Sequence, residues 1–146
     1  TEYNRLNTWF QENEPRNAKL IPGLPQEEYD RVVQACDVGL IFLDRRFTIP
    51  NFPSRLLSYL ENKMPVIAAT DPNTDIGMIA EKNDFGFRVL SGDKEGFKMA
   101  VLKLANDKNL LVRMGENGYT FLCANYLVSN SYEKIMSHFQ AEETHW

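Results

Sequence analysis

Apolar and polar positions along this chain follow two patterns, one typical of helices and one typical of buried strands. Apolar residues separated by three and four positions predict amphipathic helices, whereas short continuous apolar runs predict strands covered on both faces. Segments of the two kinds alternate over most of the chain. This alternation predicts an α/β layered fold with a parallel sheet.

The expected elements are delimited by start and stop residues as well as by periodicity. Pro15 ends the first helix, and Pro25 opens the second at a position where a missing N–H costs little. Thr74 is placed to cap a short helix that runs to Lys82. Helices are expected at residues 3–10, 25–36, 54–60, 74–82, 97–105, 111–122 and 132–139. Strands are expected at residues 18–21, 38–43, 65–69 and 86–90.

The composition is that of an ordinary globular domain, and we expect one domain over residues 1–146. Hydrophobic residues make up 43% of the chain and charged residues 25%, which excludes an intrinsically disordered protein. The formal net charge is −4, so the chain lacks the basic character of duplex-DNA-binding proteins, and we expect no nucleic-acid partner. No apolar run approaches the roughly 20 residues of a membrane span.

Few residues offer redox, metal or histidine chemistry. The two cysteines, Cys36 and Cys123, lie too far apart for zinc-finger spacing, and we expect Cys36 to be a small core residue. The two histidines, His138 and His145, lie close to the C-terminus, where chains are commonly poorly ordered. We therefore expect neither a metal site nor histidine-based catalysis, and the sequence identifies no catalytic group.

The clearest candidate binding site lies where the loop after residues 38–43 enters the next helix. Ligands of open parallel sheets bind at the carboxyl ends of the strands. Pro53 directly precedes a helix start, where free N–H groups and the helix dipole attract anions. The Ser54 hydroxyl can cap this helix or bond a phosphate, and Arg55 adds two parallel donors suited to phosphate oxygens. The competing interpretation is an ordinary serine cap beside a solvated arginine.

Other positions have less specific patterns, and their alternatives stay open. Asp44 can serve as a phosphoacceptor, a catalytic acid or a loop cap. Gly23 and Leu24 can expose backbone groups to a planar base or form an ordinary turn. Gly115 and Gly118 lie inside a helical pattern, where close helix packing is favoured over ligand contact.

Several segments together resemble one family of enzymes. Residues 53–68 resemble the "PSKLxxYxxxGKPVIA" segment of bacterial GT-B glycosyltransferases of the GT4 type. Residues 21–39, 84–93 and 110–118 resemble the family segments "FxGxvPxxelxxlyxxaDvgl", "ecGfvvppgD" and "lrxxmGenGrxyv", in the same order. The likeness extends from about residue 18 to residue 139 and rests on the order and spacing of these segments together.

The resemblance implies the C-terminal, donor-binding half of a two-domain retaining glycosyltransferase with a Rossmann-like three-layer fold. Such an enzyme transfers a sugar from a nucleotide-diphosphate donor, for example a UDP-sugar, to a growing surface polysaccharide or a lipid-linked acceptor. The resemblance implies no metal and no further cofactor, because helix N–H groups and an arginine stabilise the leaving diphosphate. It also implies a cytoplasmic protein, with peripheral contact at the inner face of the membrane through a separate N-terminal acceptor domain.

The same resemblance implies a role toward the donor for the residues of the candidate site. Ser54 and Arg55 face the diphosphate, while Gly23 and Leu24 lie along the base. The predicted diphosphate and base contacts therefore come from segments that are distant in the sequence.

The predicted sugar and ribose contacts lie close to the diphosphate residues in the sequence. Asn51 and Phe52 are implied to lie near the donor sugar. The family commonly has two glutamates at the positions held here by Pro50 and Ser58, and the second glutamate holds the ribose hydroxyls. Ser58 is expected to make at most a weaker hydrogen bond there.

The chain lacks parts that the family possesses. Two strands that separate residues 18–21 from residues 38–43 in the family's sheet have no counterpart, and neither does the acceptor domain. The sequence also does not begin with Met. We therefore expect these residues to be a fragment of a longer chain, inactive by itself.

Two other functions remain as alternatives. One is a flavodoxin-like signalling domain with Asp44 as phosphoacceptor, although no acidic cluster precedes Asp44 as such a site requires. The other is a sugar-nucleotide epimerase built on the same two-domain architecture.

Overall fold

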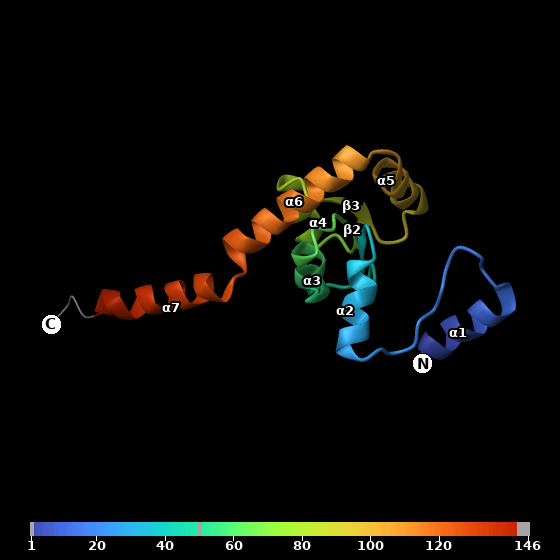
Figure 1. The fold of residues 1–146 in the computed structure, drawn as a ribbon, viewed down its shortest axis with the longest axis horizontal. Coiled ribbons are helices and arrows are strands. Elements are labelled where there is room, and N and C mark those ends of the chain that lie inside the picture. Colours follow the sequence, from blue (N-terminus) through green and yellow to red (C-terminus); the bar gives the residue numbers. More distant parts are fainter. Residues whose placement is uncertain (1, 50, 143–146) are drawn as a thin grey trace. The chain divides into compact units, whose positions relative to one another are not determined.

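The computed structural model describes residues 2–49 and 51–142, so Pro50 and His145 lie outside the described residues. The chain forms two compact units, Thr1–Val32 and Val33–Trp146, which are treated separately below. Figure 1 gives the order of the elements along the chain. Within the described residues, no helix combines the length and the apolar character needed to cross a membrane.

The first unit contains helix α1 (Glu2–Asn13) and the beginning of helix α2 (Gln26–Gln34), which continues into the second unit. Both predicted helices are confirmed. α1 ends just before Pro15, with Glu14 in the left-handed region at φ 39°. No residue of α1 is buried, and its apolar residues Tyr3, Leu6 and Trp9 are exposed.

The strand expected at residues 18–21 is absent, because this segment has no regular secondary structure. Ile21 remains 40% exposed. A strand requires hydrogen bonds from a neighbouring strand, and the sheet of the described residues contains only strands from the second unit. A short apolar run without a neighbouring strand is therefore insufficient to form a strand.

The second unit is built on an open parallel sheet of three strands, in the order β1-β2-β3. These strands are β1 (Gly39–Phe42), β2 (Val66–Thr70) and β3 (Gly86–Leu90). Gly39 is in register with Val66, which is in register with Gly86 on the other side. Every residue of β2 is buried, as its continuous apolar run predicts. The predicted α/β class and parallel sheet are confirmed.

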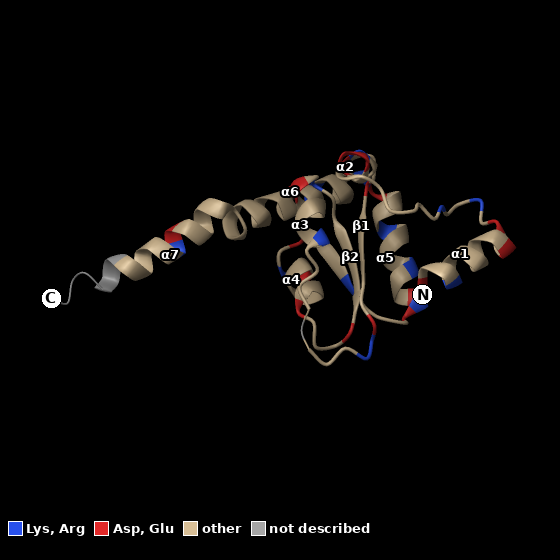
Figure 2. Ribbon diagram, turned by 90° about the horizontal axis from the view of Figure 1, so that it is seen from below, with Lys and Arg blue, Asp and Glu red and all other residues tan. Residues whose placement is uncertain are grey.

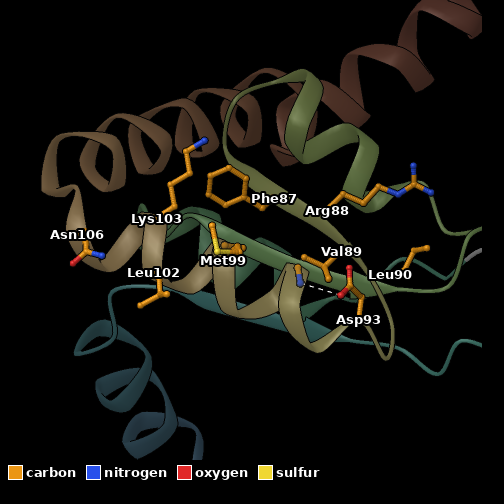
Figure 3. A pocket seen from close by; sticks show the side chains of 11 residues that line it. Phe87, Arg88, Val89, Leu90, Asp93, Met99, Leu102, Lys103 and Asn106 are labelled. Atoms are coloured by element: carbon orange, nitrogen blue, oxygen red, sulfur yellow. Dashed lines mark hydrogen bonds between the residues drawn. The ribbon is translucent and has the colours of Figure 1, made fainter.

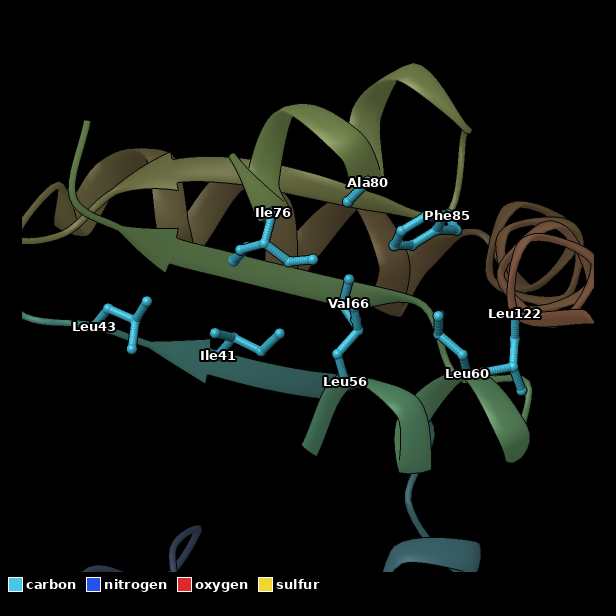
Figure 4. Packing of buried hydrophobic residues seen from close by; sticks show 10 residues of the cluster. Ile41, Leu43, Leu56, Leu60, Val66, Ile76, Ala80, Phe85 and Leu122 are labelled. Atoms are coloured by element: carbon cyan, nitrogen blue, oxygen red, sulfur yellow. The ribbon is translucent and has the colours of Figure 1, made fainter. Parts of the chain in front are cut away.

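Helices cover both faces of this sheet. α3 (Arg55–Glu61) and α4 (Ile76–Lys82) cover one face, and α5 (Lys94–Asn106) covers the other, as Figure 2 shows. α6 (Lys108–Asn125) contributes Leu122 to the first face and Met114 to the second. Figure 4 shows the larger cluster, which contains Ile41, Leu43, Leu56, Leu60, Val66, Ala68, Ile76, Ala80, Phe85 and Leu122.

β1 departs from the prediction that both of its faces are covered. Ile41 is fully buried beneath the helices of one face, but Leu40 is 37% exposed and Phe42 is 55% exposed. β1 lies at the end of the strand order, so helices that bridge two strands cover it less completely than they cover β2.

Two glycines of α6 allow this helix to lie close to α3 and to the turn that follows α3. A Cβ on Gly115 would collide with the backbone carbonyl of Lys63, and one on Gly118 would lie 2.8 Å from the Leu60 side chain. The prediction that these glycines permit close helix packing is confirmed. The final helix, α7 (Val128–Glu142), keeps Tyr132 exposed among other apolar residues.

Two local predictions are wrong. Thr74 does not cap α4, because Asp75 occupies the N-cap position and the Thr74 hydroxyl donates to the Asp71 carboxylate instead. Cys36 is exposed rather than part of the core. α2 ends at Gln34, so Cys36 falls in the turn that follows the helix and not on its buried face.

Candidate functional site

The carboxyl ends of the three parallel strands bring three loops to one edge of the sheet. These loops follow β1, β2 and β3, and their described residues are 43–49 and 51–54, 71–75, and 91–93. The Asn73 side-chain amide donates to the Phe47 carbonyl at 3.0 Å, which connects the first two loops. The Ser91 N–H donates to the Thr70 carbonyl at 2.8 Å, which holds the third loop beside β2. In Figure 2, acidic and basic residues are interspersed along the described chain.

Ser54 and Arg55 lie together at this edge, at the start of α3. Ser54 occupies the N-cap position with φ −55° and ψ −29°, and its side chain makes no capping hydrogen bond. A capping serine normally adopts extended backbone angles and accepts from a later N–H. The Ser54 hydroxyl is therefore left for another partner, and the ordinary-cap interpretation does not describe this residue. Ser54 and Arg55 are both exposed.

The backbone at the start of α3 offers fewer donors than the sequence suggested. The Leu56 N–H donates to the Pro53 carbonyl at 3.0 Å, and the Leu57 N–H donates to the Ser54 carbonyl at 3.1 Å. These two groups are already bonded. An anion at this position would depend mainly on the Ser54 hydroxyl and the Arg55 guanidinium.

Ser58 lies on the same face of α3 as the two preceding candidates. It follows Arg55 by three residues and Ser54 by four, the spacing that aligns side chains along a helix. Ser58 is half-buried, and its carbonyl accepts from the Asn62 side chain at 2.8 Å. The three residues therefore form one row that extends from the helix start.

Asn51 and Phe52 line a hollow of about 410 Å³ within the loop after β1, together with Arg46, Phe47, Thr48 and Ile49. The Phe52 ring also contacts the Tyr126 ring, with centroids 5.4 Å apart. Tyr126 in turn contacts Phe121 of α6. Phe52 thus anchors the loop to the C-terminal end of α6 as well as lining the hollow.

Gly23 and Leu24 lie in the first compact unit, unlike the other predicted site residues. A Cβ on Gly23 would meet no atom within 4 Å, and Leu24 is half-buried. Both residues belong to a segment without regular secondary structure.

Asp44 is engaged by a neighbour in its own loop. Its carboxylate accepts from the Arg46 guanidinium, with a shortest contact of 2.6 Å, and from the Arg46 N–H at 2.9 Å. The side-chain hydrogen bond from Arg46 is the largest cause that holds the Asp44 pKa well below its usual range. The same contact raises the pKa of Arg46. Of the open alternatives for Asp44, this geometry favours the loop cap.

Asp71 is a feature of this edge that the sequence analysis missed. Its carboxylate is fully buried and accepts from the Thr74 hydroxyl at 2.6 Å, the Thr74 N–H at 2.9 Å and the Asn73 N–H at 2.8 Å. The Thr74 hydroxyl is the largest cause that lowers the pKa of Asp71, and the hydrogen bonds outweigh the opposing effect of burial. The spacing of an aspartate three residues before a threonine, in a run of turn-forming residues, was the available signal.

A larger hollow, of about 920 Å³, lies between β3 and α5, outside the predicted site (Figure 3). Its wall is mainly apolar, and the Lys103 ammonium lies 5.0 Å from the centre of the Phe87 ring. Asp93 is occupied as the cap of α5, because it accepts from the Gly96 N–H at 2.9 Å. Residues that line the hollow include Phe87, Arg88, Val89, Met99, Leu102 and Lys103.

Neither metal chemistry nor known relatives assign a function to this edge. Across residues 2–49 and 51–142, no group of three or more His, Cys, Asp or Glu residues is arranged to hold a metal ion. Comparison with known protein families, curated proteins and solved structures finds no match. The function of this edge must therefore be inferred from its own residues.

Proposed function

We propose that this chain is the nucleotide-sugar-binding domain of a retaining glycosyltransferase. One observation carries the proposal. The Ser54 hydroxyl, which makes no capping hydrogen bond, lies next to the exposed Arg55 at the carboxyl edge of a parallel sheet. The resemblance of residues 53–68 to a GT-B segment supports the same assignment. Under this proposal, the second unit is a Rossmann-like three-layer half that lacks two strands of the family's sheet.

The proposed chemistry is electrostatic stabilisation of a departing nucleoside diphosphate. Breaking the bond between the sugar and the diphosphate leaves negative charge on the phosphate oxygens. Arg55 offers two parallel N–H donors to these oxygens, and the Ser54 hydroxyl offers a third donor. Ser58, one turn further along the same face, is the proposed contact to the ribose. The proposed donor site requires neither a metal nor a further cofactor.

The loop after β1 is the proposed contact to the donor sugar. Asn51 presents an exposed amide there, and Phe52 lines the adjoining hollow. Gly23 and Leu24 remain the proposed contacts to the base. The proposed acceptor is a surface polysaccharide or a lipid-linked sugar, bound by an N-terminal domain of a longer cytoplasmic chain at the inner face of the membrane.

The two alternative functions lead to different expectations. A phosphoacceptor role for Asp44 is disfavoured because Arg46 engages both carboxylate oxygens. Mass measurement after incubation with a small phosphodonor would detect such a modification. An epimerase would share the donor site, so a product assay of the longer enzyme with and without acceptor separates it from a transferase.

The proposal is tested by calorimetric titration of the 146-residue chain with UDP, ADP and GDP. We expect one diphosphate to bind and Arg55→Ala to weaken its affinity about tenfold or more, because charge-assisted hydrogen bonds are lost. Lys98→Ala is the matched control, because it removes one exposed positive charge from α5, on the other face of the sheet. Binding of no diphosphate, or equal affinity of the Arg55→Ala variant, would contradict the proposal.

A further inference from the structure

The hollow of about 920 Å³ between β3 and α5, called here the β3–α5 hollow, has a mainly apolar wall. Met99 and Leu102 of α5 line it and are 63% and 44% exposed. The core residues Val89 and Ala100 also line it and are buried. This volume lies in the range of small-molecule sites, which combine an apolar lining with a few polar groups.

The outer backbone edge of β3, beside this hollow, is protected against a further strand. The Arg88 N–H donates to the Glu81 carboxylate at 3.2 Å, and the Leu90 carbonyl accepts from the Asp93 N–H at 2.9 Å. A strand that joins a sheet needs such groups unbonded. β3 also lies at the opposite end of the strand order from β1, beside which the further strands of a longer chain are expected. These observations favour a small molecule as the occupant.

The β3–α5 hollow has a cation on its wall. The Lys103 ammonium lies 5.0 Å from the centre of the Phe87 ring. Among the side chains that the structure describes, no carboxylate forms an ion pair with this ammonium. The other cation of the lining, Arg88, has its aliphatic stem against Gly77 of α4, where an added Cβ would lie 2.7 Å from the Arg88 Cγ. Lys103 is therefore the residue placed to bind an anion.

The carboxylate of the lining lies far from this cation. Asp93 is the N-cap of α5, and its carboxylate accepts from the Gly96 N–H at 2.9 Å. Asp93 and Lys103 are about 15 Å apart along α5, at a rise of 1.5 Å per residue. Figure 3 shows them on opposite sides of Met99. The hollow thus offers a positive charge at one end and an apolar surface that extends away from it.

We propose that the β3–α5 hollow binds a small carboxylate with an aliphatic body. The carboxylate accepts charge-assisted hydrogen bonds from the Lys103 ammonium, and the aliphatic body lies beside Met99. The flexible Met99 side chain can adapt to such a chain, and burial of the chain removes apolar area from water. α5 and α3 cover opposite faces of the sheet, so this site is separate from the proposed donor site and does not depend on it.

The test is calorimetric titration of the 146-residue chain with octanoate, and with octanol as a probe of similar length without the charge. We expect octanoate to bind at one site and more tightly than octanol. Lys103→Gln should weaken octanoate binding about fivefold or more and leave octanol binding unchanged, because a charge-assisted hydrogen bond is lost. Lys98→Gln is the matched control, because Lys98 also lies on α5 but pairs with Glu95 and does not line the hollow.

A second variant tests the apolar part of the site. Met99→Ser should weaken the binding of both probes about threefold or more, because apolar contact with the aliphatic chain is lost. The side chains of Met99, Lys98 and Lys103 are exposed, and circular dichroism of each variant verifies that the fold is intact.

Each outcome decides the proposal. Absence of octanoate binding would overturn it, and so would an equal loss of affinity in the two lysine variants, which would indicate general attraction to positive charge. Equal affinities for octanoate and octanol would overturn the assignment of an anionic ligand. Unchanged binding by Met99→Ser would show that the probes bind elsewhere.

Discussion

Gly115 of α6 lies directly against the backbone carbonyl of Lys63, in the turn that joins α3 to β2. Lys63 is in the left-handed region at φ 53°, and the Met64 N–H closes the turn by donating to the Tyr59 carbonyl at 3.0 Å. The Lys63 ammonium also pairs with the Glu116 carboxylate at 2.9 Å. The fixed turn and the helix that crosses it are therefore positioned by a contact that only glycine allows.

We expect Gly115→Ala to destabilise the fold by about 1–3 kcal/mol, because the added methyl must displace backbone rather than a flexible side chain. The higher helix propensity of alanine offsets part of this cost. The free energy of unfolding from urea titration, followed by circular dichroism, measures the effect. Gly23→Ala is the control, because a Cβ there would meet no atom within 4 Å. Equal stability of the two variants would show that the contact is not restrictive.

Local spacing predicts the features of this fold that depend on nearby residues. The helices, the continuous apolar run of β2 and the packing role of Gly115 all follow from short-range patterns. The failures concern long-range partners. Residues 18–21 have the composition of a strand but no neighbouring strand. Phe42 is apolar, as core residues usually are, but it lies on an edge strand and is exposed.

In the candidate site, too, features set by nearby residues are predictable and features set by long-range partners are not. The position of Ser54 and Arg55 at a helix start is predictable from the sequence, because a proline and a polar residue precede an apolar helical pattern. The absence of a capping bond at Ser54 is not predictable, since it depends on backbone angles set by the preceding loop. The burial of Asp71 depends likewise on how the loop after β2 closes over its carboxylate.

The second prediction concerns helix caps. Ser54→Ala should change the free energy of unfolding by less than about 0.5 kcal/mol, because an exposed hydroxyl without a capping bond is lost. Asp93→Ala should cost about 0.5–2 kcal/mol, because the Asp93 carboxylate accepts from the Gly96 N–H at 2.9 Å and caps α5. Urea unfolding of the two variants under identical conditions makes the comparison. A larger loss for Ser54→Ala than for Asp93→Ala would contradict the structure.

The third prediction concerns the anchor of the loop after β1. Phe52 and Tyr126 are in ring contact at 5.4 Å, so Phe52→Ala and Tyr126→Ala should not have additive effects on stability. A double-mutant cycle should give a coupling energy of about 0.5–1.5 kcal/mol. Phe47 lies in the same loop, and among the described residues its ring is not in contact with the Tyr126 ring, so the cycle of Phe47→Ala with Tyr126→Ala is the control. Equal coupling in the two cycles would argue against a specific anchor.

The fourth prediction concerns acid stability and the buried carboxylate of Asp71. An unfolded aspartate has a pKa of about 3.9, and the pKa of Asp71 in the fold is lower, chiefly because of the Thr74 hydroxyl. Asp71 therefore stabilises the fold fully above about pH 4, and this contribution is lost as the pH falls toward its lower folded pKa. Thr74→Val removes the hydroxyl and should raise the Asp71 pKa toward its usual value.

We expect Thr74→Val to lower the free energy of unfolding by about 1–3 kcal/mol near pH 7, and by less near pH 3. Urea titrations at several pH values between these two measure how the effect depends on pH. Thr70→Val is the matched control, because the equally buried Thr70 hydroxyl donates to the Asp71 backbone carbonyl at 3.2 Å rather than to its carboxylate. The control should lose stability by the same amount at every pH. The lowered pKa of the exposed Asp44 is common to all three proteins, so a difference in pH dependence between the variants reports on Asp71 alone.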